Sequence, residues 1–464
     1  MEIVIIITET LKETAEIAKI IIFLEKVWFL FFTKRKATHL SQDFMIFKGK
    51  QQAQILVLAL LILSGIFTSS LRASVPIETG AQQFSQYIWR LKGKRVMVIA
   101  NQTSVVNGVH LIDTLLRLGI NITGVFAPEH GFRGSAANGE HVQNQIDVKT
   151  GLPIYSLYGQ NYKPTKVQLE NCDVLVFDIQ DVGVRFYTYL TTLHFAMQAC
   201  CEQRKTIIVL DRPNPNGYFV DGPTLQPGLE SMVGIHPIPL VHGMTLGELS
   251  YMISGERWLN KTIPKAGTKS KATVKNGSPA SKSIYDSLQL VVVPCKNWIR
   301  SQGYSLSIPP SPNLPTDNSI LLYPTLGLLE GTIMSMGRGT TKPFECFGAP
   351  WLKQGSYSFT PVDIPGKAVN PPYENQSCRG ILLTDFGPSY LRNFKHLYIE
   401  WLVMLNEECP DSIKFFNPFF TKLIGNNSIQ KMIESGKDAN FIRNSWASEV
   451  ELFLTKRRKY LLYP

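Results

Sequence analysis

Asp173-Val-Leu-Val-Phe-Asp178 is a short apolar run that continues into a segment rich in charged and aromatic residues, Ile179-Gln-Asp-Val-Gly-Val-Arg-Phe-Tyr-Thr-Tyr189. A second apolar run, residues 122–127, leads in the same way into Pro128-Glu-His-Gly-Phe-Arg-Gly134. Runs of this kind are typical of strands in a buried parallel sheet. In open α/β sheets, ligands bind in the crevice beyond the carboxyl ends of the strands. We therefore expect the functional site directly after these two runs.

Strands and helices alternate regularly around the two runs. Apolar runs predict strands at residues 95–100, 122–127, 173–179 and 206–210, with a short strand or extended loop at 152–158. Amphipathic spacing predicts helices at 110–118 and 185–203. Such alternation implies right-handed crossovers, so the predicted fold class is α/β with a Rossmann-like parallel sheet. The segment after the first strand, residues 100–108, lacks the G-x-G-x-x-G fingerprint, and we expect no dinucleotide cofactor.

The chain divides into four expected regions. Residues 1–74 form a targeting region, 75–261 a Rossmann-like catalytic domain, 262–287 a basic linker or insertion, and 288–464 a smaller C-terminal α+β domain. The linker assignment depends on a composition rich in Lys, Ser, Gly and Thr. Thr245 is expected to cap a helix that runs to about residue 254. The elements predicted in the second half are strands at 288–294 and 380–384, helices at 321–331 and 396–405, and a helical tail at 424–462.

Residues 45–73 have the three-part form of a secretory signal. A basic segment precedes an apolar run at residues 55–67, and small residues follow near Ala73. Met45 is a natural start for this signal, which makes residues 1–44 an upstream extension. The alternative is an uncleaved signal that anchors the protein in a membrane. The first interpretation predicts a secreted or periplasmic protein.

Composition narrows the class of partner. The chain has 464 residues, of which 44% are hydrophobic and 18% charged, as is typical of a globular protein. A net charge of +11 favours anionic partners such as an acidic cell-wall polymer or a membrane surface. No arginine-rich run interleaved with aromatic residues is present, so nucleic acid is not an expected partner. The seven cysteines include no C-x-x-C pair, and we expect buried free thiols.

Three carboxylates follow the two strands and are candidates for acid–base catalysis. Glu129 is the strongest, because a carboxyl group shielded by neighbouring phenylalanines favours its protonated form and suits a general acid. Its alternative role is an ion pair with Arg133 or a helix cap. Asp178 and Asp181 are candidates for the second carboxylate that glycoside hydrolysis usually needs. Asp181 equally fits a cap for the helix expected near Arg185.

Basic and aromatic residues near the same strand ends are candidates for substrate binding. Arg133 and Arg185 are close enough in sequence to hold an anionic group through two parallel hydrogen bonds, or to neutralise the local acids. Tyr187 and Tyr189 are two residues apart, so on a helix only one of them is expected to reach the site. Aromatic rings often bind sugars, although a tyrosine at helical spacing is more often part of a core.

A second charged pair, Glu330 and Arg338, stands among glycines in the C-terminal half. These two residues either close the cleft from the second domain or form a structural ion pair. The chain contains no H-E-x-x-H spacing and no G-x-S-x-G elbow, so neither a metal nor an activated serine is expected. The residues that would have to form a metal site are His130, His141, His194, His242, Glu129 and Asp178.

Several runs, in order from about residue 90 to the end of the chain, follow one known pattern. They are Phe126-Ala-Pro-Glu-His-Gly-Phe-Arg-Gly134, Val176-Phe-Asp-Ile-Gln-Asp-Val-Gly183, Arg185-Phe-Tyr-Thr-Tyr189, Leu210-Asp-Arg-Pro-Asn-Pro215, His242-Gly-Met-Thr245, Ser311-Pro-Asn-Leu-Pro-Thr316, Glu330-Gly-Thr332, Gly337-Arg-Gly-Thr340 and Lys459-Tyr-Leu-Leu-Tyr463. With these runs the chain closely resembles the exo-β-N-acetylmuramidase family, long described as a domain of unknown function.

The resemblance implies a secreted bacterial glycosidase with a Rossmann-like catalytic domain and a smaller C-terminal domain. Such enzymes remove N-acetylmuramic acid from the non-reducing ends of peptidoglycan fragments, so MurNAc-GlcNAc sugars are the implied partners and no cofactor is implied. Glu129 falls in the motif used for the proposed catalytic acid. The second catalytic group is another carboxylate, a tyrosine such as Tyr187, or the acetamido group of the substrate. The motif residues expected to bind the substrate are His130, Arg133, Glu140, Arg185, Asp211, Asn214, His242, Glu330 and Arg338.

Two other classes of function stay open at this point. A catalytically inactive peptidoglycan-binding protein would release no free sugar. A metal-dependent amidase or esterase acting on wall fragments would be inhibited by a chelator. Residues 1–44 and the long segment 262–287 depart from the family pattern, but neither contains one of its motifs.

Overall fold

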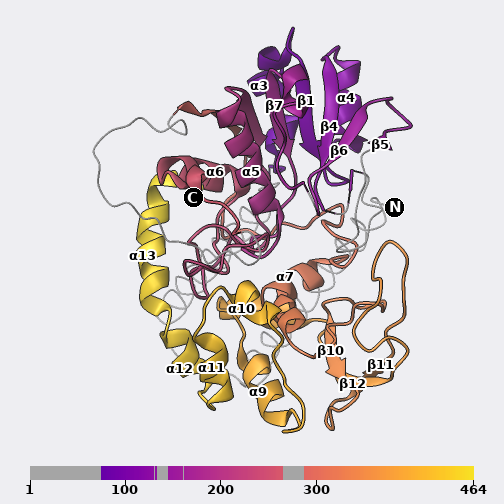
Figure 1. Cartoon of the computed structure of the whole chain (residues 1–464), viewed down its shortest axis with the longest axis vertical. Coiled ribbons are helices and arrows are strands. Elements are labelled where there is room, and N and C mark those ends of the chain that lie inside the picture. Colours follow the sequence, from indigo (N-terminus) through magenta and orange to yellow (C-terminus); the bar gives the residue numbers. More distant parts are fainter. Residues whose placement is uncertain (1–74, 130, 133–144, 160, 265–286) are drawn as a thin grey trace, which may run out of the picture. The chain divides into compact units, whose positions relative to one another are not determined.

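The parallel sheet expected around the two apolar runs is present and has seven strands (Figure 1). The computed structural model describes residues 75–129, 131–132, 145–159, 161–264 and 287–464. The signal expected at residues 45–73 and most of the linker expected at 262–287 lie outside these residues. Of the described chain, Pro76–Pro464 form one compact unit.

Neighbouring strands of this sheet run parallel, except that β5 runs antiparallel to β6. The α/β prediction with a Rossmann-like sheet is therefore confirmed. The strands, in their order across the sheet, are β5 (Gln145–Ile146), β6 (Pro153–Ser156), β4 (Ile122–Ala127), β1 (Val96–Ala100), β7 (Val174–Asp178), β8 (Thr206–Leu210) and β9 (Gln289–Val293).

Helices cover both faces of the sheet, which explains why its central strands are apolar throughout. In β1, Val96 and Val98 belong to the core that includes α3 (Phe84–Leu91) and α4 (Leu111–Arg117). Met97 and Ile99 belong to the core on the other face, with α5 (Tyr189–Glu202) and α6 (Leu246–Gly255). All residues of α5 except the last are buried, because this helix lies between the sheet and the rest of the chain.

Local sequence sets the helix starts, with one informative difference from expectation. Thr245 caps α6 as predicted, since its hydroxyl accepts from the Glu248 amide and the Glu248 side chain accepts from the Thr245 amide. Helix α5 begins at Tyr189 rather than near residue 185. The Arg185 amide donates to the Leu240 carbonyl instead, and the Tyr187 amide donates to the Val184 carbonyl, so a turn precedes α5.

The C-terminal part contains a three-stranded antiparallel sheet and a group of short helices. The helix expected at residues 321–331 is α7 (Asp317–Leu326) followed by the 3-10 helix η5 (Gly327–Gly331). The expected helical tail is broken into separate helices. Gly425, with a φ of 70°, and Gly436, with a φ of 72°, lie in its first two breaks. The remaining elements are β2 (Val105–Val106), β3 (Val109–His110), β10 (Cys346–Ala349), β11 (Tyr357–Phe359), β12 (Cys378–Leu382), α8 (Arg392–Phe394), α9 (Glu400–Glu408), α10 (Phe419–Ile424), α11 (Ile429–Glu434), α12 (Ala439–Asn444) and α13 (Ala447–Arg457).

The strand at residues 288–294 lies elsewhere than expected. The sequence assigns it to the C-terminal domain, but β9 pairs in parallel with β8 and forms an edge of the seven-stranded sheet. Its apolar residues Val292 and Val293 pack into the two cores on either face of that sheet. The chain therefore returns to the first sheet after the linker, before it enters the C-terminal part.

The end of the chain also returns to the first sheet (Figure 1). Helix α13 leads to Tyr460, whose hydroxyl donates to Glu256 directly after α6. The Tyr463 hydroxyl donates to Asp211 at 2.5 Å, next to the end of β8. These contacts tie the C-terminal helices to the sheet.

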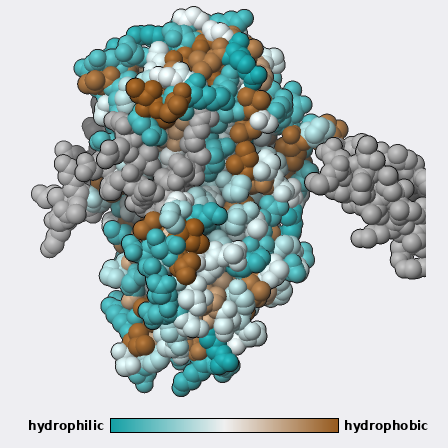
Figure 2. Space-filling view, turned by 90° about the vertical axis from the view of Figure 1, so that its right-hand side faces the viewer, coloured by the Kyte–Doolittle hydropathy of each residue, from teal (hydrophilic) through white to brown (hydrophobic). Residues whose placement is uncertain are grey.

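The surface seen in Figure 2 is mostly hydrophilic, with hydrophobic residues in small separate groups. None of the helices in the described residues is long and apolar enough to cross a membrane. All seven cysteines lie in the described part of the chain, and none of them forms a disulfide there. Six of them are buried and Cys409 is half-buried.

Candidate active site

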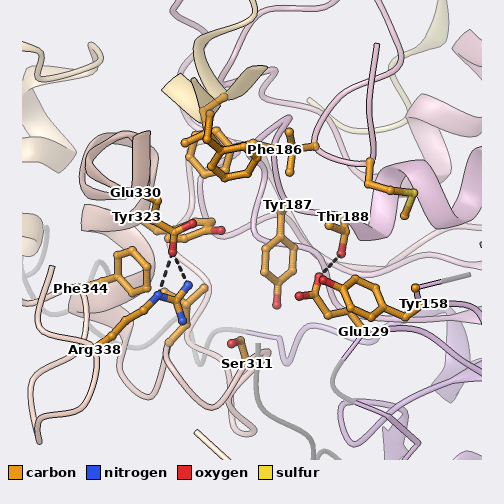
Figure 3. Close-up of a pocket in the computed structure, with 16 residues that line it drawn as sticks. Glu129, Tyr158, Phe186, Tyr187, Thr188, Ser311, Tyr323, Glu330, Arg338 and Phe344 are labelled. Carbon is orange, nitrogen blue, oxygen red and sulfur yellow. Dashed lines mark hydrogen bonds and ion pairs between the residues drawn. The ribbon is translucent and has the colours of Figure 1, made fainter. Parts of the chain in front are cut away.

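A cavity of about 430 Å³ lies beyond the end of β4, where the sequence predicts the site (Figure 3). Glu129 follows β4 by two residues and lines one wall. The opposite wall comes from η5 and the loop after it, which supply Glu330 and Arg338. A volume at the lower end of the range for small-molecule sites suits one sugar unit.

Glu129 stands on the first wall between two hydroxyl-bearing residues. It is 7% exposed, and Thr188, directly before α5, donates its hydroxyl to Glu129 Oε2 at 2.8 Å. Burial, and then the charge of Glu129, raise the pKa of Tyr158 far above its ordinary value, so Tyr158 stays a phenol. Among the described residues no cation is paired with Glu129. The ion pair with Arg133 that the sequence offers as an alternative role involves a residue outside the described part of the chain. The place of Glu129 on the cavity wall suits a general acid.

Tyr187 lines the cavity between the two walls. Its hydroxyl donates to the Pro310 carbonyl at 2.9 Å, and its ring packs edge-on against Tyr189 and Tyr323. Burial raises the pKa of Tyr187 well above the ordinary tyrosine value. Tyr187 is thus held as a neutral phenol rather than as a nucleophilic phenolate. Tyr189 does not line the cavity, in line with the expectation that one of the two would reach the site.

Arg338 and Glu330 form an ion pair on the opposite wall. Arg338 Nε donates to Glu330 Oε1 at 2.9 Å, and Nη2 donates to the same oxygen. The guanidinium carbon lies 4.9 Å from the centre of the Phe344 ring, a cation–π contact. Both expected roles of this pair are therefore present, because it is an ion pair and it lines the cavity.

Asp178, a candidate for the second carboxylate, does not line the cavity. It is fully buried, and Arg212 donates to it from Nε at 2.6 Å and from Nη2 at 2.9 Å. Arg212 follows β8, the neighbour of β7 in the sheet. The two strand ends therefore bring this acid and base together, and the pair is a structural salt bridge.

Asp181 and His242 are also buried away from the cavity. Asp181 Oδ2 accepts from the Gly183 amide at 2.7 Å, so Asp181 closes a turn and does not cap α5. Burial raises the pKa of Asp181 to about 7 and lowers that of His242 to about 3. His242 Nε2 lies 4.0 Å from Asp181 Oδ2. Neither residue can reach a sugar in the cavity without a rearrangement.

Arg185, one of the two arginines predicted to hold an anionic group of the substrate, does not line the cavity. Its side chain is fully buried, and its guanidinium donates to four backbone carbonyls at 2.7–3.2 Å. Two of these carbonyls belong to loops near the sheet and two to the end of α10. The four acceptors are Pro223, Ile238, Leu423 and Ile424. Arg185 therefore joins the two parts of the chain.

Asp211 and Asn214 hold the start of α6 instead of a substrate. Asp211 accepts from the Thr245 hydroxyl at 2.6 Å and from the Gly247 amide at 2.8 Å. Asn214 donates to the Met244 carbonyl at 2.9 Å. Both side chains are buried and absent from the cavity wall. The motif after β8 therefore connects the end of that strand to the start of α6.

Three predicted binding residues, His130, Arg133 and Glu140, lie outside the described residues. In the described part of the chain, no group of three His, Cys, Asp or Glu side chains is placed to hold a metal ion. Sequence reasoning did not single out Tyr158, Thr188, Ser311 or Phe344, which all line the cavity. Thr188 and Ser311 lie within runs that resemble the family, residues 185–189 and 311–316. Tyr158 and Phe344 lie outside all of these runs.

An α/β sheet with a buried acid at a strand end, facing a sugar-sized cavity, is an arrangement that suits a hydrolase of small polar substrates. Comparisons with known proteins make the class specific. Residues 96–318 match the family described as "Exo-beta-N-acetylmuramidase NamZ, N-terminal", and residues 321–463 match its C-terminal counterpart. The chain belongs to this exo-β-N-acetylmuramidase family.

Individual relatives agree with this assignment. The chain is 37% identical over 416 residues to the peptidoglycan β-N-acetylmuramidase NamZ of Bacillus subtilis (strain 168), covering 83% of this chain and 91% of the relative. It is similar to crystal structures of two DUF1343 family proteins from Bacteroides fragilis. One is 41% identical with a TM-score of 0.73, and the other is 30% identical with a TM-score of 0.67. Each match covers 84% of this chain and 99% of the solved chain.

Proposed function

We propose that this protein is an exo-acting glycoside hydrolase that releases N-acetylmuramic acid from the non-reducing ends of peptidoglycan fragments. The observation that carries the proposal is Glu129, a buried acid at a strand end that faces a cavity of one-sugar size. The relative in Bacillus subtilis, a peptidoglycan β-N-acetylmuramidase by name, supplies the substrate class. The activity belongs to cell-wall turnover or recycling.

In the proposed reaction, Glu129 donates its proton to the glycosidic oxygen as the bond from C1 to that oxygen breaks. Water then supplies the hydroxyl group that C1 gains in the product and the proton that restores the Glu129 carboxyl group. Thr188 holds the Glu129 carboxyl group in place through the hydrogen bond to Oε2. Tyr187 remains a phenol next to the sugar. Glu330, the other described carboxylate of the cavity, is held in an ion pair with Arg338. The two carboxyl groups thus support different roles.

The direct test is incubation of the purified protein with a MurNAc-GlcNAc disaccharide that carries MurNAc at its non-reducing end. We expect free N-acetylmuramic acid and N-acetylglucosamine, detected by mass spectrometry. The same assay with a chelator should give the same yield, since the proposed chemistry uses no metal. Binding of the disaccharide without any release of sugar would make the protein a peptidoglycan-binding module instead.

We also propose that the mature protein is exported. The support is the basic segment, apolar run and small-residue end of residues 45–73. Peptidoglycan fragments outside the cytoplasm would then be its substrates. Mass spectrometry of the protein from its native host should find a mature amino terminus near residue 74. A cytosolic protein that retains residues 45–73 would contradict export.

A further inference from the structure

Arg338 is fixed on the cavity wall by three independent features. Glu330 accepts from its Nε and Nη2, and the Phe344 ring lies under its guanidinium. Its neighbours Gly337 and Gly339 both have a φ of 78°, a conformation that residues with side chains rarely adopt. A Cβ atom on Gly339 would stand 2.5 Å from the Val362 carbonyl oxygen. The loop thus holds Arg338 in one place.

The Arg338 guanidinium retains unused hydrogen-bonding capacity. Its Nη1 is buried and has no hydrogen-bond partner among the residues that the structure describes. Buried donors are nearly always paired, and Arg338 lines the cavity, so an anionic ligand in the cavity is an available acceptor for Nη1. Arg185 differs because both of its Nη atoms donate to two carbonyls each, and its unpaired Nε belongs to a side chain that does not line the cavity.

We propose that Arg338 binds the lactyl carboxylate of N-acetylmuramic acid and so distinguishes this sugar from N-acetylglucosamine. This inference rests on the function proposed above. The lactyl carboxylate is the only charge on the sugar, and Arg338 is the only cation among the described residues of the cavity wall. A guanidinium can hold a carboxylate in a fixed orientation, which an ammonium group cannot reproduce. Glu330 balances the charge of Arg338 while the cavity is empty.

The order of groups around the sugar ring agrees with the order of residues along the cavity. Glu129 and Arg338 stand on opposite walls, with Tyr187 between them (Figure 3). In the sugar, the anomeric carbon C1 and the lactyl-bearing carbon C3 flank C2, which carries the acetamido group. Placing C1 at Glu129 therefore directs the lactyl group toward Arg338 and the acetamido group toward Tyr187.

The first test compares two activated glycosides, 4-nitrophenyl β-N-acetylmuramide and the same compound with its lactyl carboxylate converted to a neutral amide. We expect the wild type to prefer the acid by about 10- to 100-fold in kcat/KM, the range for a charged hydrogen-bonded contact. Arg338→Gln should remove this preference by lowering turnover of the acid alone. Arg338→Lys, which keeps the charge but not the planar fork, should retain only part of it.

Two matched variants separate recognition from stability. Arg379→Gln alters an exposed arginine on β12 and should leave both rates unchanged. Arg185→Lys should lower the temperature of unfolding but keep the acid-to-amide preference. If Arg338→Gln keeps the preference, or if both substrates lose equally, the carboxylate is bound elsewhere. Should Arg338→Gln fail to fold, the same criteria apply to Arg338→Lys.

A binding experiment decides the inference even if the proposed function fails. Calorimetry with free N-acetylmuramic acid and its lactamide is carried out on Glu129→Gln, which removes turnover. We expect the acid to bind about 10- to 100-fold more tightly, and Glu129→Gln/Arg338→Gln to bind both sugars equally. Equal binding of both sugars to Glu129→Gln alone would overturn the role of Arg338. Absence of sugar release by the wild type would instead refute only the hydrolase proposal.

Discussion

The two walls of the cavity each present a glutamate, but they surround it differently. Glu129 stands at the end of a buried strand with hydroxyl-bearing neighbours and no described counter-cation. Glu330 stands at the end of a 3-10 helix and is neutralised by Arg338. Identical carboxyl groups are therefore adapted to different tasks by their neighbours. The first wall suits proton transfer, and the second suits recognition of a charged group.

Replacement of Glu129 by Gln should have the largest effect. The amide keeps the size and the hydrogen bond to Thr188 but has no transferable proton. We expect a loss of about 100- to 10,000-fold in kcat/KM on the disaccharide. An activated phenolic leaving group needs little protonation, so 4-nitrophenyl glycosides should lose far less.

The control for this variant is Glu451→Gln, on an exposed position of α13, which should match the wild type. If Glu129→Gln loses the same factor on both kinds of leaving group, Glu129 is not the general acid. Glu129 would then have no role in proton transfer, and the comparison between the two walls would lose its functional meaning.

A third acid, Asp181, sharpens the comparison because it lies behind the tyrosines between the walls. Burial raises the pKa of Asp181 from 3.8 to about 7. Between pH 3.8 and about pH 7, Asp181 is therefore protonated in the folded protein and ionised in the unfolded chain. Its contribution to stability is complete below about pH 4 and is lost as the pH rises through about 7. Asp181→Asn cannot titrate. We take the free energy of unfolding of Asp181→Asn minus that of the wild type. This difference should be about 2–4 kcal/mol more positive at pH 8 than at pH 4.

Denaturant titrations between about pH 4 and pH 8 measure this difference. The exposed Asp411→Asn provides the matched control and should remain parallel to the wild type. A constant difference between Asp181→Asn and the wild type across this range would show that Asp181 is ionised throughout.

Replacement of Glu330 by Gln should have the smallest effect on rate. The amide oxygen can still accept from Arg338 Nε, so the guanidinium keeps its place. We expect kcat/KM on the disaccharide to fall by about tenfold or less, the effect of one modest hydrogen-bond change. A loss as large as that of Glu129→Gln would contradict the comparison and indicate a mechanism that uses both carboxylates.

The sheet could be predicted from the sequence because each strand is a buried apolar run. The strands at Ile122–Ala127 and Thr206–Leu210 match the prediction at both ends. Glu129 was found by the same reasoning, since a residue just beyond a strand end must lie at the edge of the sheet. The pair of Asp178 with Arg212 follows from adjacent strand ends and was within reach of this argument.

The rest depended on contacts between distant parts of the chain. Tyr158 follows an outer strand, and Phe344 follows a glycine-rich loop in the C-terminal part, so neither has a local signal. Arg185 was misassigned because nearness to the strand end was taken to mean nearness to the substrate. A single bridge from Val184 to Val241 and a turn precede α5, and the Arg185 side chain lies in the core rather than at the cavity.

The environment of Arg185 has a consequence for how the protein can change during evolution. All four acceptors of its guanidinium are main-chain carbonyls, so residues at those positions can be exchanged without altering the contact. Its partners therefore need not covary with it. The constraint falls on Gly425, where a Cβ atom would stand 2.4 Å from Arg185 Nη2 and where φ is 70°. In related sequences, the trace of this buried cation should be an invariant glycine rather than a matching acid.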